Sequence, residues 1–216
     1  MTALNTKPAD PRSKPAPVKS KMDTIVLIRH GKPALSRKVK LTGRGFRDWW
    51  IRYDEGGLKP DQKVPKKIQD WVEKADLVVS SPLRRAYESA ELATGREPDE
   101  RWIELIEAAL PSPSLGPLKF RPKTWGTIAR IIWAVGYSDG MESRAEARAR
   151  AEAACDKLEA AAADGQTVLV LGHGWFNRMI KGSLMKRGWR LKSQNGDLHW
   201  SRRRLVRPSH KGPHRE

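Results

Sequence analysis

The sequence predicts an α/β fold, a three-layer α/β/α sandwich around a mostly parallel central sheet. Two observations lead to this prediction. The segments 24–28 (TIVLI) and 167–172 (TVLVLG) are continuous apolar runs, as expected of parallel strands that are covered on both faces. Candidate strands are also interspersed with candidate helices, which is typical of a parallel sheet joined by helical crossovers.

The local patterns predict four strands and five helices. The expected strands are 24–28, 75–81, a weaker segment at 101–107, and 167–172. The expected helices are 45–57, 64–75, 82–94, 143–163 and 174–188. Pro82 suits the first turn of its helix, and the Ser143–Glu146 pair has the spacing of a capping box. The proline-rich stretch 110–125 is expected to be a long loop with a functional or mobile role.

Length and charge indicate one folded domain with basic ends. The chain has 216 residues and a formal net charge of +17, and roughly half of that charge lies in residues 1–22 and 200–216. The Lys- and Pro-rich stretch 1–22 has too little apolar surface to offset the entropy of ordering, so we expect a disordered tail there. The folded domain is expected over 23–199, and 200–216 is expected to be a basic, flexible tail.

Composition narrows the possible classes of protein. A single cysteine, Cys155, excludes an internal disulfide framework and a cysteine-based zinc cluster. No apolar run approaches the length of a membrane span, and the first residues have no apolar core of a secretory signal. We therefore expect a cytoplasmic protein without a membrane span. The excess positive charge favours anionic partners.

The chemistry is concentrated where two apolar strands end. The first strand is followed by Arg29, His30 and Gly31, and the strand 167–172 is followed by His173 and Gly174. In open α/β sheets ligands bind outside the carboxyl ends of the strands. We therefore predict that the two histidines, which are far apart in sequence, meet at one site.

A third segment, SSPLRRA (80–86), adds positive charge to the same edge. It follows the strand 75–81 and opens a helix, so Arg84 and Arg85 lie in a first turn, where free N–H groups and the helix dipole favour an anion. Guanidinium groups match the geometry of phosphate oxygens. Two histidines and two arginines at strand ends indicate a site for a phosphoryl group.

Together these motifs resemble the histidine phosphatase superfamily, also called phosphoglycerate-mutase-like. The elements RHG (29–31), SSPLRRA (80–86), LIEAALP (105–111) and GHG (172–174) occur in the order of that family. The resemblance implies that His30 is the nucleophile, that Arg29, Arg85 and His173 hold the phosphoryl oxygens, and that Glu107 protonates the leaving group.

Some assignments within these motifs remain open. The family pattern favours Glu107 over Glu104 as the acid, but a bulge in the strand would change which side chain faces the site. Arg84 and Lys32 are candidates for the rim of the substrate site, although each has an alternative as an exposed or ion-paired charge. Arg178 and Arg44 could also line the pocket.

The residue types support phosphoryl transfer without a metal or other cofactor. Neutral histidine can act as a covalent nucleophile, and phosphoryl transfer depends mainly on positioning and on charge neutralisation. Arg29, Arg85 and His173, with His173 as an imidazolium, would supply that charge. A carboxylic acid such as Glu107 would assist departure of an alkoxide.

These arguments favour a phosphatase that hydrolyses a phosphomonoester through a phosphohistidine. A phosphomutase of the same superfamily is the first alternative, although Lys32, Pro33 and Ser36 depart from the pattern that mutases commonly show after RHG. The second alternative is a basic module on this fold that binds anions or nucleic acid through its tails. The expected partner is a small phosphorylated substrate rather than nucleic acid.

Overall fold

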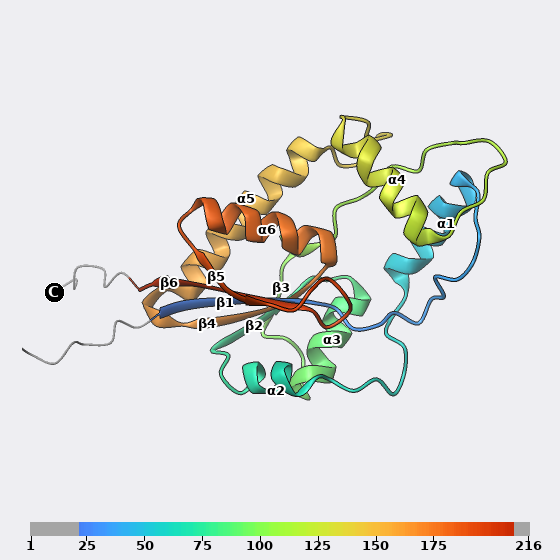
Figure 1. Ribbon diagram of the computed structural model, residues 1–216. Coiled ribbons are helices and arrows are strands. Elements are labelled where there is room, and N and C mark those ends of the chain that lie inside the picture. The colour runs from blue at the N-terminus through green and yellow to red at the C-terminus, as the bar shows by residue number, and fades with distance from the viewer. Residues whose placement is uncertain (1–21, 210–216) are drawn as a thin grey trace, which may run out of the picture.

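A computed structural model describes residues 22–209 of the protein. Six strands form one sheet in the order β3-β2-β4-β1-β6-β5. The strands β1 (Met22–Arg29), β2 (Leu77–Ser80), β3 (Glu100–Arg101) and β4 (Thr167–Gly172) are parallel. The strand β6 (Arg202–Pro208) pairs antiparallel with β1, and β5 (Arg190–Gln194) pairs antiparallel with β6. The predicted α/β fold class is confirmed (Figure 1).

Helices cover both faces of the sheet. Figure 1 shows α5 (Arg144–Ala162) and α6 (Gly174–Lys186) on one face and α2 (Lys66–Val72) and α3 (Arg84–Thr94) on the other. The helices α1 (Gly43–Glu55) and α4 (Pro122–Ala134) lie beyond the carboxyl ends of the parallel strands. Short 3₁₀ turns occur at Ile103–Leu105 and Ala163–Gly165. This arrangement places α1 and α4 on the side of the domain where the parallel strands end.

The apolar runs of the central strands supply both halves of the core. Side chains alternate across a strand, so Ile25 and Leu27 pack into the cluster beneath α5 and α6. Val26 and Ile28 pack into the smaller cluster toward α2 and α3. Because both faces are covered, no polar residue interrupts the run.

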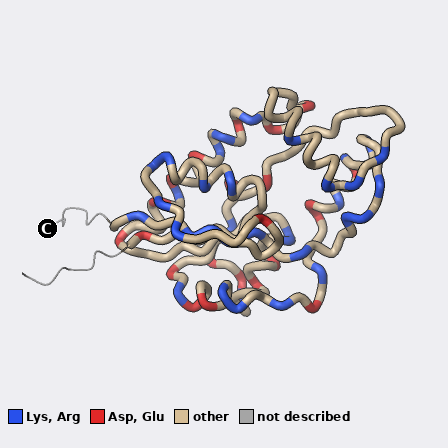
Figure 2. The backbone as a smooth tube through the Cα atoms, viewed as in Figure 1, with Lys and Arg blue, Asp and Glu red and all other residues tan. Residues whose placement is uncertain are grey.

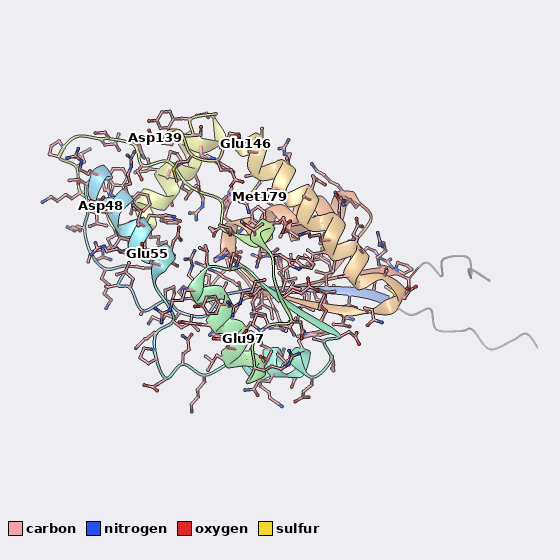
Figure 3. All side chains as sticks on the ribbon, turned by 180° about the vertical axis from the view of Figure 1, so that it is seen from behind. Asp48, Glu55, Glu97, Asp139, Glu146 and Met179 are labelled. Atoms are coloured by element: carbon pink, nitrogen blue, oxygen red, sulfur yellow. The ribbon has the colours of Figure 1, made fainter. Side chains whose placement is uncertain are left out.

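The helix α5 forms as its sequence predicts. The Ser143 hydroxyl accepts from the Glu146 backbone N–H, and the Glu146 carboxylate accepts from the Ser143 N–H, so the capping box is confirmed. Figure 3 shows Glu146 at the start of this helix. The free Cys155 is buried on the face that packs against the core.

The weak strand expected at 101–107 is mostly absent. Only Glu100 and Arg101 pair with β2, and the chain then turns into the 3₁₀ segment. After the hydrogen bond from the Trp102 N–H to the Ser80 carbonyl, the chain leaves the sheet. The apolar residues that suggested a strand belong to a 3₁₀ turn, which buries Leu105 and exposes Ile103.

The expected loop at 110–125 ends earlier than predicted, because α4 begins at Pro122. A proline at the first helical position costs no hydrogen bond, so its presence did not mark a loop. The side chains of Trp125, Ala129 and Trp133 recur every fourth residue and are buried against α1 and the core. This helix brings further residues to the site described below.

The prediction that residues 200–216 form a flexible tail is wrong for the part that the structure describes. Residues 202–208 form β6, which pairs with β1 across its whole length. Leu205 and Val206 are buried, while Arg203 pairs with Asp197 and Arg207 donates to Glu159 at 2.6 Å. Two of the four arginines in this run are ion-paired, and the Arg204 guanidinium lies 5.0 Å from the Trp71 ring centroid, so a basic run could become a strand.

Residues 1–21 and 210–216 lie outside the described part of the chain, so the tail predicted for 1–22 can be compared only at Met22, which begins β1. Between residues 22 and 209, none of the helices has the length and apolar character needed to cross a bilayer.

Candidate active site

The two histidines meet at the carboxyl edge of the sheet. Arg29, the last residue of β1, pairs in register with Gly172, the last residue of β4. His30 and His173 therefore leave the sheet side by side, and their ring centroids are 5.3 Å apart. The prediction that these two rings, far apart in sequence, lie close together is confirmed.

The environment of His30 fixes both its charge and its tautomer. Its Nδ1 lies 2.7 Å from the Gly31 carbonyl oxygen, and because a carbonyl only accepts, Nδ1 carries the hydrogen and Nε2 keeps its lone pair. Burial, followed by the charges of Arg85, His173 and Arg29, lowers the pKa of His30 well below its ordinary value. The ring is therefore neutral near pH 7, as a nucleophile requires.

His173 is also neutral when no ligand is bound, whereas the predicted imidazolium concerns the state with a phosphoryl group in the site. Burial, Arg85 and Arg29 lower the pKa of His173 well below its ordinary value. Its Nε2 lies 2.8 Å from the Ser81 hydroxyl, and its Nδ1 is buried without a partner among the described residues. A phosphate group would oppose the effect of the arginines, so this ring gains a proton most easily when an anion is bound.

Arg85 is held rigidly by the end of α1. Its side chain is 1% exposed, and its Nη1 donates to the Tyr53 carbonyl oxygen at 3.1 Å and lies 2.9 Å from Asp54 Oδ1. The guanidinium also lies 4.6 Å from the centroid of the Tyr53 ring. Burial raises the pKa of Asp54, although the nearby Arg85 charge opposes that rise. Sequence reasoning predicted Arg85 but gave no role to Tyr53 and Asp54.

Arg29 approaches the same site from β1. Its Nη1 donates to the Asp197 carbonyl oxygen at 2.6 Å, and its Nε is buried without a partner among the described residues. A Cβ at Gly174 would lie 3.1 Å from this Nε. Glycine after His173 therefore lets the start of α6 approach the guanidinium closely.

Arg84 and Lys32, the two candidates for the substrate rim, are exposed, unlike the buried residues around the histidines. The Arg84 guanidinium is exposed and donates to Glu88 at 2.6 Å, one helical turn along α3. Lys32 is exposed, and its backbone carbonyl accepts from the Lys59 N–H at 2.8 Å. Neither side chain lines the cavity at the site. The ion-paired alternative for Arg84 therefore agrees with the structure.

The structure places Glu107, and not Glu104, at the start of α6, the helix that directly follows His173. The Glu107 carboxylate accepts from the backbone N–H groups of Phe176 at 2.8 Å and Trp175 at 3.3 Å, in the first turn of α6. Glu104 instead forms an ion pair with Lys157 at 2.5 Å. The 3₁₀ turn directs the two carboxylates to different surroundings.

The segment that carries Glu107 is anchored by Arg150 of α5. This guanidinium donates to the carbonyl oxygens of Glu104 at 2.9 Å and Ile106 at 2.7 Å. It also pairs with Glu142 at 2.6 Å and lies 4.0 Å from the Phe176 ring centroid. Arg150 is therefore a positioning residue, because it fixes the backbone that directly precedes Glu107.

An open cavity of about 720 Å³ begins at Arg29, Gly174 and Glu107 and extends toward α4. Arg178 lines it, as considered from the sequence, but Arg44 does not. The other lining residues come from the loop after β1, from α4, from α6 and from the turn before β6: Arg37, Lys123, Thr127, Arg130, Ile131, Ala134, Trp175, Asp197 and Leu198.

A third imidazole, His199, was missed by sequence reasoning. Its ring centroid is 5.7 Å from that of His30, and its Nε2 is buried without a partner among the described residues. Burial and the charges of Arg29, Arg37 and Lys32 lower its pKa to about 4. The sequence places His199 at the last position of the predicted domain, where nothing indicates a role. It reaches the strand ends because residues 202–208 pair with β1. The described histidines and carboxylates form no group suited to hold a metal ion.

The depressed histidine pKa values predict a loss of stability in acid. In the unfolded chain a histidine has a pKa of about 6.5. In the folded protein the pKa values of His30, His173 and His199 are lower, so these rings stay neutral at that pH. The unfolded state thus binds more protons below that pH, and the free energy of unfolding falls as the pH drops. For His199 this loss extends down to a pH of about 4.

Urea unfolding between pH 7.5 and 4.5 tests this prediction by comparing the wild type with His199→Gln. The variant is expected to lose less stability over this range. The ceiling per histidine is about 1.4 kcal/mol per pH unit, reduced for half-buried His199 by solvent screening. Equal pH dependence in the two proteins would contradict the assigned direction of the His199 pKa.

Comparison with known proteins gives one family and several solved structures. Residues 25–204 match the family model described as the histidine phosphatase superfamily (branch 1). No curated protein matches the chain. A mycobacterial glucosyl-3-phosphoglycerate phosphatase is similar with a TM-score of 0.51 and 23% identity, covering 76% of this chain and 80% of that one.

Two further solved structures have the same fold. "Mycobacterial hydrolase 2" has a TM-score of 0.52 and 21% identity, covering 88% of this chain and 84% of that chain. A phosphoserine phosphatase mutant from Entamoeba histolytica has a TM-score of 0.50 and 14% identity, covering 84% and 89% of the two chains. At these identities the structural likeness concerns the fold.

Proposed function

We propose that this chain, which belongs to the histidine phosphatase superfamily, hydrolyses a phosphomonoester without a metal through a phosphohistidine at His30. The observation that carries the proposal is a set of buried, unpartnered nitrogen atoms around a neutral imidazole. The Nε atoms of Arg29 and Arg85 and the Nδ1 of His173 have no partner among the described residues. Buried polar groups are normally satisfied, and phosphoryl oxygens would satisfy these.

In the first step, His30 Nε2 attacks phosphorus and the bond from phosphorus to the ester oxygen breaks. The leaving oxygen takes the electron pair and a proton from Glu107. The Nδ1–H hydrogen bond to the Gly31 carbonyl stabilises the positive charge that develops on the ring. The products of this step are the alcohol and an enzyme phosphorylated at His30.

In the second step, water attacks the phosphohistidine. The Glu107 carboxylate accepts a proton from that water, the bond between phosphorus and Nε2 breaks, and His30 regains its lone pair. Inorganic phosphate is released, and Glu107 is again protonated for the next cycle. Both steps use only groups that the chain carries.

The arginines supply charge stabilisation in fixed positions. Arg85 is held by Asp54 and Tyr53, and Arg29 is held by the Asp197 carbonyl. Donors that are already oriented toward developing charge lower the barrier without reorganising during the reaction. With the protonatable His173, they would neutralise the phosphoryl oxygens of the transition state.

The proposal is tested with 4-nitrophenyl phosphate in the presence of EDTA. Free phosphate should be released, and rapid denaturing quench with radiolabelled substrate should trap a phosphoenzyme that is stable in base and labile in acid. Peptide mapping should locate the label at His30. Turnover without such an intermediate, or turnover that EDTA abolishes, would overturn the proposal.

The same experiment separates the phosphatase from its alternatives. A phosphomutase would move phosphate between positions of a phosphorylated sugar acid instead of releasing it. The binding-module alternative rested on basic tails, and its support is weaker because Arg203 and Arg207 of β6 form ion pairs within the fold.

A further inference from the structure

We propose that the alcohol part of the substrate carries a second anionic group, a carboxylate or a phosphate, which Arg130 and Arg37 bind in the cavity beside Glu107. This inference rests on the proposed function, because that function assigns Glu107 to the leaving group. It identifies the substrate as a small phosphorylated acid or a bisphosphate, and excludes neutral phosphorylated alcohols as preferred substrates.

The position of Glu107 identifies which part of the substrate the cavity receives. A general acid must reach the oxygen that departs, so the leaving alcohol lies on the Glu107 side of the phosphoryl group. His30 and Arg85 are almost fully buried and do not line the cavity, whereas Arg29 and Gly174, which adjoin the two histidines in sequence, and Glu107 do line it. The cavity therefore extends from the phosphoryl site along the direction of the leaving group.

The cavity has more positive charge than its own carboxylates can balance. Beyond Arg29 it is lined by Arg37, Lys123, Arg130 and Arg178, and its carboxylates are Glu107 and Asp197. Asp197 already pairs with Arg178 at 2.5 Å and with Arg203. Figure 2 shows Lys and Arg recurring along α4 and the loop after β1. Charge on Arg37, Arg130 and Lys123 is left for a ligand.

Arg130 is poised to bind an anion. Its Nη1 donates to the Gly126 carbonyl at 3.0 Å, and its guanidinium lies 5.3 Å from the Trp175 ring centroid, so the side chain is held in place. Its Nε is buried without a partner among the described residues. Burial lowers the pKa of Arg130. The positive charges of Arg29, Arg178 and Arg37 lower this pKa further, whereas the Glu107 carboxylate raises it. A bound anion would relieve this repulsion.

Arg37 brings a second donor from a different segment. It belongs to the loop after β1, lines the same cavity, and also has a buried Nε without a partner in the described part of the chain. Two guanidinium groups from separate segments can bind the oxygens of one carboxylate or phosphate. An ion pair within the protein would have been the usual way to satisfy such groups, and none is formed by Arg37 or Arg130 among residues 22–209.

The remaining walls fit a short carbon skeleton between the two anionic groups. Ile131, Ala134 and Leu198 give the cavity an apolar side, and its volume of about 720 Å³ is that of a small-molecule site. A phosphate at His30 and an anion at Arg130 would thus be the two polar ends of a small substrate.

A matched pair of substrates tests the inference. Glycerol 3-phosphate and 3-phosphoglycerate differ at one terminal carbon, which is a neutral alcohol in the first and a carboxylate in the second. The wild type is expected to show a kcat/KM at least ~10-fold higher for 3-phosphoglycerate. Glycerol 1,3-bisphosphate provides the same comparison for a second phosphate, so the two arms distinguish the two kinds of anion.

Variants locate the effect. Arg130→Gln and Arg37→Gln should each reduce the ratio of the two kcat/KM values toward one, and Arg130→Lys should retain an intermediate ratio. Lys67→Gln removes the same charge from α2 on the opposite side of the sheet and should leave the wild-type ratio unchanged. Circular dichroism and the melting temperature verify folding of each variant.

The outcomes separate this inference from the proposed function. Equal or lower kcat/KM for both anionic substrates, with the phosphoenzyme still formed from 4-nitrophenyl phosphate, would overturn the inference alone. A preference that Arg130→Gln and Arg37→Gln leave intact would overturn the assigned site. Absence of both the phosphoenzyme and hydrolysis of every substrate would overturn the proposed function and this inference with it.

Discussion

Replacement of His30 by alanine should reduce turnover of 4-nitrophenyl phosphate on the order of 10⁴-fold or more and abolish the trapped phosphoenzyme. The hydrogen bond between His30 Nδ1 and the Gly31 carbonyl leaves the Nε2 lone pair free to attack, and Arg29 and Arg85 lie close enough to act on this ring. Water in its place would be neither positioned nor activated. Initial rates and rapid-quench labelling measure the two effects.

Binding provides the control for this variant. Arg29, Arg85 and His173 remain in His30→Ala, so inorganic phosphate or vanadate should still bind, as isothermal titration calorimetry would show. Retained anion binding with lost turnover would assign His30 to the chemical step. Wild-type turnover in His30→Ala would refute the covalent mechanism.

Replacement of Glu107 by glutamine should slow the enzyme in a way that depends on the leaving group. General acid catalysis contributes about 10²–10⁴-fold when the departing oxygen needs a proton. Alkyl phosphates should therefore lose activity to about this extent, whereas 4-nitrophenyl phosphate should lose far less, because nitrophenolate departs without protonation. The slope of log(kcat/KM) against leaving-group pKa measures the difference.

Glu104→Gln is the matched control, since it makes the same chemical change three residues away in a carboxylate that pairs with Lys157. Its dependence on the leaving group should equal that of the wild type. If instead Glu104→Gln steepened the dependence and Glu107→Gln did not, the assignment of the acid would be reversed.

Patterns within single strands and turns predicted the centre of this site. Continuous apolar runs identify strands that are buried on both faces, and parallel strands end at one edge. The residues that follow such runs, His30 and His173, could therefore be brought together by topology alone. The same reasoning placed Arg84 and Arg85 together at this edge, because a helix start after a buried strand has a fixed place in this architecture. The resemblance to the family then selected Arg85.

The outer parts of the site could not be predicted, because they depend on contacts between distant segments. Asp54 sits on a helix whose sequence shows only an amphipathic pattern, and nothing local indicates that it faces Arg85. His199 reaches the site only because β6 pairs with β1. Arg130 reaches it only because α4 forms after a proline that resembled a loop marker.

The position of β1 inside the sheet has a consequence for how the enzyme loses activity. The N–H of Arg29 donates to the Ser201 carbonyl on one side, and that of His30 donates to the Gly172 carbonyl on the other, each at 2.9 Å. These amides exchange with solvent only when the centre of the sheet opens. Fraying of the outermost strands would leave the reacting imidazole in register, so inactivation on heating should follow cooperative collapse of the whole domain.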